Sequence, residues 1–90
     1  MGFEWDERKR ESNLLIHGVD FIDVLPVFDG ATLEIVDDRF NYGETRIRCL
    51  GEIEGRVYAV VYTWRGVNRR IISARKANAR ERRTYYARQR

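Results

Sequence analysis

The spacing of apolar residues changes at Asp29 and Gly30, and this change limits the elements that the chain can form. Before it, four apolar residues follow the i, i+3, i+4, i+7 spacing of one helix face; they are Phe21, Val24, Leu25 and Phe28. After it, apolar residues recur at every second position in stretches separated by short turn sequences, as in half-buried strands. Helices followed by hairpin-linked strands predict an α+β domain with a mostly antiparallel sheet. At 90 residues, the chain has room for a single domain, residues 1–90.

The expected elements run in the order βααββββα. A first strand covers residues 3–5, and a helix capped by Asp6 ends at His17, before Gly18. A second helical stretch opens at Asp20, and because Pro26 removes one helical hydrogen bond, we expect either a kink or a short helix that ends near Phe28. Strands follow at 32–36, 45–53, 56–64 and 68–76, with a polar loop at 37–44, turns at 54–55 and 65–66, and strand 56–64 in the centre. Asn78 and Glu81 have the spacing of a capping box and open a last helix.

Side-chain direction follows from these elements. In strand 45–53, Ile47, Cys49 and Gly51 share one face. In strand 68–76, one face has Ile71, Ser73 and Arg75, and the other has Arg70, Ile72, Ala74 and Lys76. The first helix is polar until its last turn, so Leu14, Leu15 and Ile16 are expected to bury most of its apolar surface.

Charge is divided unequally between the two halves of the chain. Residues 1–45 carry four basic and eleven acidic side chains, whereas residues 46–90 carry thirteen basic and three acidic ones. A concentration of basic residues points to a polyanionic partner. Lys9 and Lys76 are the only lysines, and the arginine fork that dominates instead binds phosphate through two hydrogen bonds. The alternative is a solvated basic face that pairs with acids of the same chain.

Several common chemistries have no motif in this sequence. The phosphate-binding GxxxxGK[ST] and GxGxxG, the hydrolase GxSxG and the zinc-binding HExxH are missing. A single cysteine, Cys49, excludes an internal disulfide, and a single histidine, His17, excludes paired-histidine zinc motifs. Asp37 and Asp38 are adjacent, but strand geometry would point them to opposite faces, so a solvated turn is favoured over a metal site. We therefore expect no metal and no cofactor.

The same inventory bears on location. The longest apolar run, residues 57–62, is too short to cross a membrane, and the first residues lack the basic and apolar regions of a signal peptide. We expect a soluble, cytoplasmic protein without a membrane partner. Cys49 falls on an apolar strand face and is expected to be a buried thiol rather than a nucleophile.

The residues that remain suit RNA. Aromatic side chains stack on unpaired bases while arginines hold phosphates, and aromatic residues accompany the basic ones at Tyr58, Tyr62, Trp64, Tyr85 and Tyr86. The alternative is that the strand aromatics form the core, and that one of Tyr85 and Tyr86 anchors the last helix. Metal-free RNA cleavage needs a group that takes the 2′-hydroxyl proton, a group that stabilises the phosphate and a group that protonates the 5′-oxygen. His17 is the histidine candidate for proton transfer, although a histidine before a helix-ending glycine also suits the helix dipole.

A family resemblance runs along nearly the whole chain. Its most specific residues are Trp5, Asp6 and Glu7, then Asn13 with His17 and Gly18, then the segment RIISAR at 70–75, and finally Ala77, Glu81, Arg82 and Tyr85. In this order they resemble the BrnT family of bacterial type II toxins. Relatives commonly read N-x-x-K-H-G, and this chain has Ile16 in place of the lysine. If that lysine binds phosphate or takes part in catalysis in relatives, this chain works more slowly or uses another base; if it is only a surface residue there, the substitution changes nothing.

The resemblance implies a RelE-like ribonuclease fold and a metal-independent endoribonuclease that inhibits translation by degrading RNA. It also implies a BrnA-like ribbon-helix-helix antitoxin, with operator DNA bound only through the antitoxin complex. Carried over residue by residue, Arg75 and Arg82 hold the scissile phosphate and His17 is the acid or base. Further RNA contacts are expected from Arg65, Arg69, Arg70, Lys76 and Tyr85.

Other interpretations remain open at this point. Arg75 or Arg82 could instead form an ion pair with Glu52 or Glu81, and Glu81 could simply cap its helix. The whole chain could be a non-catalytic RNA-binding module that uses its basic C-terminal half, or a DNA-binding regulator. A last helix rich in arginine fits backbone contacts better than base reading.

Overall fold

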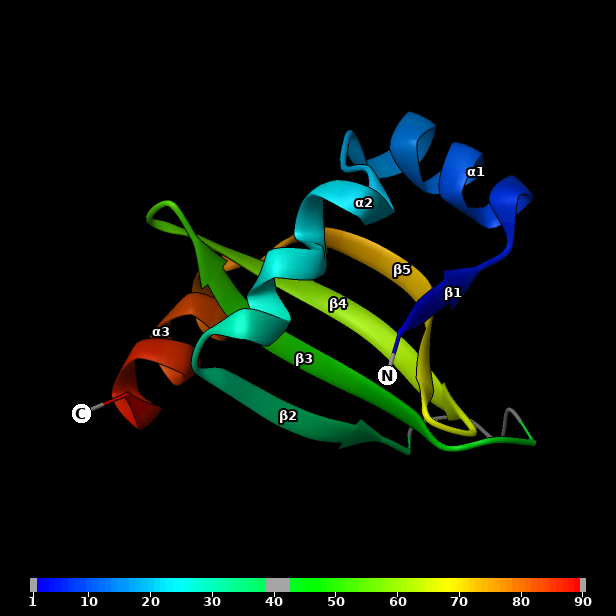
Figure 1. Ribbon diagram of the computed structural model, residues 1–90. Coiled ribbons are helices and arrows are strands. Elements are labelled where there is room, and N and C mark those ends of the chain that lie inside the picture. The colour runs from blue at the N-terminus through cyan, green and yellow to red at the C-terminus, as the bar shows by residue number, and fades with distance from the viewer. Residues whose placement is uncertain (1, 39–42, 90) are drawn as a thin grey trace.

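The computed structural model of this chain describes residues 2–38 and 43–89, and its elements follow the predicted order (Figure 1). They are β1 (Phe3–Trp5), α1 (Glu7–His17), α2 (Phe21–Val24), the 3-10 helix η1 (Leu25–Asp29), β2 (Thr32–Asp37), β3 (Arg46–Ile53), β4 (Arg56–Arg65), β5 (Asn68–Lys76) and α3 (Ala79–Arg88). Part of the predicted loop at 37–44 lies outside the described residues, because 39–42 are not among them. The turn expected at 65–66 forms one residue later, at Gly66 and Val67.

The five strands form one mixed sheet in the order β1-β5-β4-β3-β2. The pairs β2–β3, β3–β4 and β4–β5 are antiparallel, and β1 is parallel to β5. The predicted α+β class, the mostly antiparallel pairing and the central place of β4 are therefore confirmed. The parallel β1 makes the sheet mixed, since the chain crosses over the sheet between β1 and β2 rather than turning back in a hairpin.

Local hydrogen bonds explain where the helices begin and end. The Asp6 carboxylate accepts from the Arg8 N–H at 2.8 Å at the start of α1, and Gly18 closes the helix with φ 69° while donating to the Leu14 carbonyl at 2.9 Å. The Asp20 carboxylate caps α2 in the same way. The expected kink or short helix ending near Phe28 takes the form of a one-turn α2 followed by η1, which continues to Asp29 around Pro26, a residue with no N–H for an α-helical bond.

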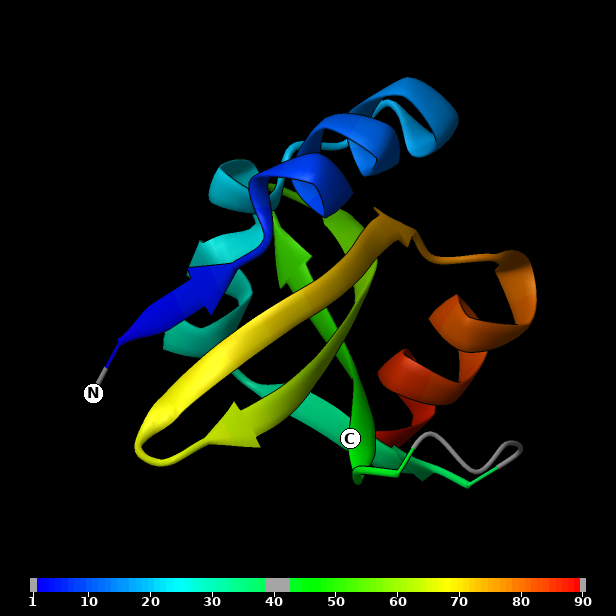
Figure 2. The ribbon, with the colours of Figure 1, turned by 90° about the vertical axis from the view of Figure 1, so that its right-hand side faces the viewer.

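The short helices α2 and η1 lie on one side of the sheet, and α3 lies on the other (Figures 1 and 2). On the side of α2 and η1, which we call the α2 face, the core contains Val19, Phe21, Val24, Val27, Cys49, Val60, Tyr62, Ile71 and Ala74. On the side of α3, which we call the α3 face, it contains Leu50, Val57, Ala59, Ala77 and Tyr85. The expected grouping of Ile47, Cys49 and Gly51 is confirmed, since Ile47 packs against the α2-face core and Gly51 lies against Val27.

A β-bulge changes the faces predicted for β5. Val61 pairs with Ser73 while Tyr62 pairs with Ile71, so Ile72 is an extra residue in β5. As a result Ile71 and Ala74 both belong to the α2-face core, although strict alternation had assigned them to opposite faces. Arg75 is opposite Ala59 and Arg70 is opposite Thr63, so both arginines lie on the α3 face.

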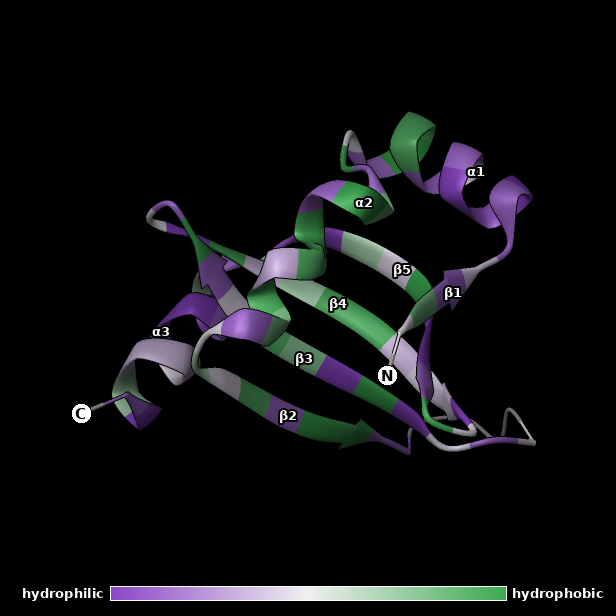
Figure 3. Cartoon of the chain, in the orientation of Figure 1, coloured by the Kyte–Doolittle hydropathy of each residue, from purple (hydrophilic) through white to green (hydrophobic). Residues whose placement is uncertain are grey.

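The prediction that the last turn of α1 is buried is also wrong. Figure 3 shows that α1 turns from hydrophilic to hydrophobic at its end, yet Leu14, Leu15 and Ile16 are 46%, 87% and 71% exposed. The buried residue of α1 is Asn13, whose amide donates to the carbonyls of Val19 and Ala74 and accepts from the Ala74 N–H. A polar side chain therefore attaches α1 to β5. It does so where β5 extends past its pairing with β1, because the backbone groups of β5 there need other hydrogen-bond partners.

Candidate nucleic-acid interface

Arginines from three adjacent strands share the α3 face of the sheet. Leu50 packs beneath α3, so alternation along β3 puts Arg46 and Arg48 on the same face. The others are Arg65 from β4, and Arg70 and Arg75 from β5. α3 covers one end of this face, where Leu50, Val57 and Ala59 lie, and these five arginines remain half-buried or exposed. A sheet face of this kind offers planar donors to a phosphate backbone.

Glu81 holds two of these arginines in place. It is 5% exposed, and its carboxylate accepts from Arg75 Nη1 and Nη2 at 2.7 and 2.9 Å and from Arg48 Nη1 at 2.7 Å. The same carboxylate accepts from the Asn78 N–H, and the Asn78 side chain accepts from the Glu81 N–H, which is the predicted capping box. The ion pair between Arg75 and Glu81, one of the open alternatives, is therefore present.

The electrostatics of this cluster favour an anion. Burial alone would raise the pKa of Glu81, but the hydrogen bonds from Arg75, Asn78 and Arg48 outweigh it and lower the pKa to about 2. Two guanidinium groups thus share one carboxylate that stays ionised at neutral pH. The side chains of Arg48 and Arg75 are still 31% and 35% exposed, so a ligand on the α3 face can reach both.

Arg82 lies in a different setting, although it is close to Arg75 along the chain. It lines a hollow of about 460 Å³ together with Gly55, Arg56, Val57, Lys76 and Ala77. Its Nη1 donates to the Ala77 carbonyl at 3.0 Å, while Arg75 Nη1 donates to the carbonyl of the preceding residue, Lys76, at 3.4 Å. The two guanidinium groups therefore flank the same short segment, with Arg75 next to Glu81 and Arg82 in the hollow.

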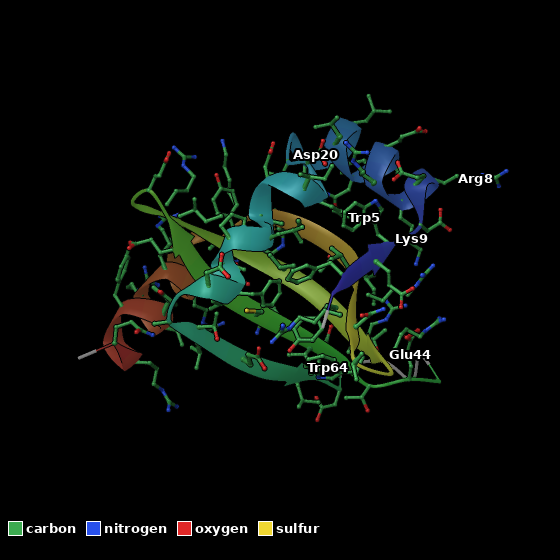
Figure 4. All side chains as sticks on the ribbon, in the orientation of Figure 1. Trp5, Arg8, Lys9, Asp20, Glu44 and Trp64 are labelled. Carbon is green, nitrogen blue, oxygen red and sulfur yellow. The ribbon has the colours of Figure 1, made fainter. Side chains whose placement is uncertain are left out.

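His17 lines a separate hollow of about 350 Å³ at α1. Its walls are formed by Arg8, Lys9, Ser12, Asn13, Ile16, His17 and Ile72, and do not include Arg75 or Arg82. Figure 4 shows Arg8 pointing away from the sheet at the start of this helix. The exposed side chain of Ile16, at the position of the family lysine, borders this hollow, so a lysine there would add a third basic side chain to it.

The remaining candidate arginines differ in their surroundings. Arg69 lies on the α2 face, and its guanidinium carbon is 4.4, 4.7 and 5.4 Å from the ring centres of Phe28, Trp64 and Tyr62. Arg70 is 3.5 Å from Glu4, on the α3 face. Arg65 is exposed at the end of β4. Arg69 and Lys76, which pair with α2-face residues of β4, therefore lie on the opposite side of the sheet from Arg70 and Arg75.

One of the two tyrosines of α3 anchors the helix to the sheet. Tyr85 is 5% exposed in the α3-face core and its hydroxyl donates to the Ala31 carbonyl, so little of this side chain is accessible for the predicted RNA contact. It is the residue that anchors α3. Tyr86 is 44% exposed and its hydroxyl bonds the Glu52 carboxylate. Cys49 is buried as expected, and desolvation raises the pKa of its thiol to about 12, which keeps it protonated.

Three residues of this region, Arg46, Arg48 and Arg56, were missed as site residues. Arg48 had a usable signal, because alternation puts Arg46 and Arg48 together on the face opposite Ile47 and Cys49. Arg56 gave none, because only the fold brings the start of β4 beside Lys76 and Arg82.

Within residues 2–38 and 43–89, no group of three His, Cys, Asp or Glu side chains is placed to hold a metal ion. No helix in the described part of the chain is long and apolar enough to span a membrane.

Fold and site together define a small α+β protein with an arginine-lined sheet face suited to a phosphate backbone. The family described as the ribonuclease toxin BrnT of type II toxin-antitoxin systems matches residues 5–81, and this chain belongs to that family. The structure is similar to the 1.1 Å crystal structure of the Brucella abortus ribonuclease toxin BrnT, with 31% identity and a TM-score of 0.67 over 87% of this chain and 97% of that one. A comparison with curated proteins gives no match.

Proposed function

We propose that this chain is a metal-independent endoribonuclease that cleaves RNA and inhibits translation, with Arg75 as its main phosphate-binding residue. The observation that carries the proposal is the Arg48–Glu81–Arg75 cluster on the arginine-lined α3 face. Membership of a ribonuclease toxin family supplies the reaction class. The cluster supplies a rigid, positively charged contact of the kind that stabilises charge in a transition state.

The chemistry needs only groups that the RNA and this chain contain. A base takes the 2′-hydroxyl proton, the 2′-oxygen bonds to phosphorus, and the 5′-oxygen leaves with a proton, which gives a 2′,3′-cyclic phosphate and a 5′-hydroxyl. Arg75, assisted by Arg48, donates hydrogen bonds to the phosphate oxygens as negative charge builds up on them. Because both guanidinium groups are already fixed by Glu81, little reorganisation is needed when the phosphate binds.

His17 is proposed as the acid or base. Asn13 lies one helical turn before it and bonds the backbone of Ala74, the neighbour of Arg75. The end of α1 is thereby fastened beside the end of β5, which supports a role for His17 near a strand of RNA held by Arg75.

The partners follow the family. A type II toxin has an antitoxin, and we propose a ribbon-helix-helix protein that covers the arginine face and carries the complex to operator DNA. The proposed place of action is the cytoplasm, where translated RNA is found.

The test is cleavage of a long RNA by the purified protein in EDTA. The Arg75→Ala variant should lose roughly 10²–10³-fold in rate, the effect of removing one hydrogen-bond donor to a transition-state anion. Arg83→Ala, which removes the same charge from an exposed position of α3, should keep nearly all activity. Tight RNA binding without cleavage would instead identify a non-catalytic RNA-binding module, and cleavage abolished by EDTA would contradict metal independence.

A further inference from the structure

Three cations from three elements line one hollow in which no acidic residue takes part. Arg56 comes from β4, Lys76 from β5 and Arg82 from α3, and the other walls are Gly55, Val57 and Ala77. The volume of about 460 Å³ leaves room for a phosphate group and part of its sugar. An anion fits this hollow because every charged group in its lining is positive.

The fold holds these side chains together. The chain reverses after β3 at Glu54 and Gly55, whose φ values are 50° and 81°. This tight turn starts β4 at Arg56, directly opposite Ile53 of β3. The Ala77 N–H donates to the Val57 carbonyl at 2.9 Å, so the end of β5 is tied to the start of β4. The bond from Arg82 to the Ala77 carbonyl then places the α3 guanidinium against the same segment.

The charge of this hollow is not neutralised within the described residues. Among the residues that the structure describes, the ion pairs involve Arg10, Arg46, Arg48, Arg70 and Arg75. None of them involves the three cations of the hollow. The nearby Glu52 carboxylate is engaged by the Tyr86 hydroxyl. Like charges held close together repel one another, and a bound anion removes that repulsion. The Arg48–Arg75 pair differs, since Glu81 already lies between its members.

We propose that this hollow is a second phosphate-binding subsite, which holds a backbone phosphate of RNA next to the one bound by Arg75. Lys76 is the last residue of β5, so the hollow lies at the end of the sheet rather than on the α2 face. Arg75 and Arg82 donate to the carbonyls of consecutive residues there, Lys76 and Ala77, so one RNA strand can pass from one guanidinium group to the other. The subsite recognises phosphate rather than base, and therefore positions the strand without reading its sequence. It rests on the proposed function for its ligand, and it assigns Arg82 to a phosphate other than the scissile one.

The experiment measures binding rather than cleavage. A fluorescent RNA oligonucleotide with 2′-O-methyl groups, which has no free 2′-hydroxyl to attack, is titrated with the wild type and with Arg56→Ala, Lys76→Ala and Arg83→Ala over a range of salt concentrations. If a phosphate contact is lost in Arg56→Ala or Lys76→Ala, affinity should fall several-fold, and the slope of log K against log salt should flatten by about 0.7. The matched control Arg83→Ala should leave the slope unchanged.

The outcomes separate this proposal from the ribonuclease function. A flatter slope of log K against log salt in Arg56→Ala and Lys76→Ala supports the subsite even if the wild type never cleaves RNA. Slopes equal to the wild type in both variants, with the folds intact by circular dichroism, would overturn it even if the enzyme is active. Competition by inorganic phosphate that weakens wild-type binding and has no effect on Lys76→Ala adds support. Phosphate binding that leaves oligonucleotide affinity unchanged would show a site for free phosphate and overturn the assignment to RNA.

Discussion

At the scale of single residues, Glu81 links helix capping to the candidate interface. Its carboxylate accepts from the Asn78 N–H at the start of α3 and, at the same time, from Arg48 and Arg75 on two strands. The two alternatives considered for it, a helix cap and an ion-pair partner, are therefore both realised. A group that serves the fold and the site together cannot be changed without affecting both.

Acid should remove part of the stability that Glu81 provides. Its pKa is lowered from 4.5 to about 2 in the folded protein, so the carboxylate stabilises the fold above about pH 4.5, and this stabilisation is lost as the pH falls toward 2. The shift corresponds to at most about 3 kcal/mol in the free energy of unfolding. Urea unfolding at several pH values from about 7 to about 2.5 measures it. Glu81→Gln should be less stable at neutral pH and should lose less on acidification; an equal loss would contradict this account.

At the scale of elements, close packing between η1 and β3 fixes the α2 face. A Cβ built at Gly51 would lie 2.7 Å from the Cβ of Val27, closer than side chains tolerate. Glycine is therefore required here by the approach of the 3-10 helix, and η1 can cover the sheet only because β3 has no side chain at this point.

Gly51→Ala should lower the free energy of unfolding by about 1–3 kcal/mol through overpacking. Adding Val27→Gly should recover part of this loss, because it removes the Cβ that the new side chain would meet at 2.7 Å, and a double-mutant cycle measures the coupling. Gly30→Ala is the control, since a Cβ at Gly30 meets nothing within 4 Å. Additive effects of the two substitutions at Gly51 and Val27 would show that this contact does not determine the packing.

At the scale of the whole molecule, the sheet divides the protein into two unlike sides. One face is sealed by α2 and η1 over an apolar core, while α3 covers only part of the other and leaves the arginine cluster accessible. Most of the basic half of the sequence contributes to this accessible side, which explains how a net charge of only +3 can accompany a strongly basic surface.

We expect the cognate antitoxin to block RNA cleavage by covering this accessible side. Hydrogen exchange of the complex should show slower exchange in β3, β5 and the start of α3 than in the free toxin, together with loss of RNA binding. The start of α1, which follows the edge strand β1, is the internal reference for exchange that the antitoxin should not change. A complex that cleaves RNA at the rate of the free toxin would contradict this expectation.

The sequence alone determined the features that depend on neighbours within about four residues. Asp6, Gly18 and the Asn78–Glu81 pair were found as caps because their hydrogen bonds close within one helical turn. The range of β5 and the central place of β4 followed from local apolar patterns, and the basic character of the second half followed from counting charges.

Only the tertiary structure decided which distant groups meet. The bulge at Ile72 depends on pairing with β4, and it changed the faces of half of β5. Arg48 and Glu81 are separated by 33 positions, and Arg56 reaches Lys76 and Arg82 only because Ala77 is bonded to Val57. Whether Tyr85 or Tyr86 anchors α3 depends on how the helix rotates against the sheet. These outcomes are set by strand register and by competition for a small core, neither of which is encoded in any short stretch of the chain.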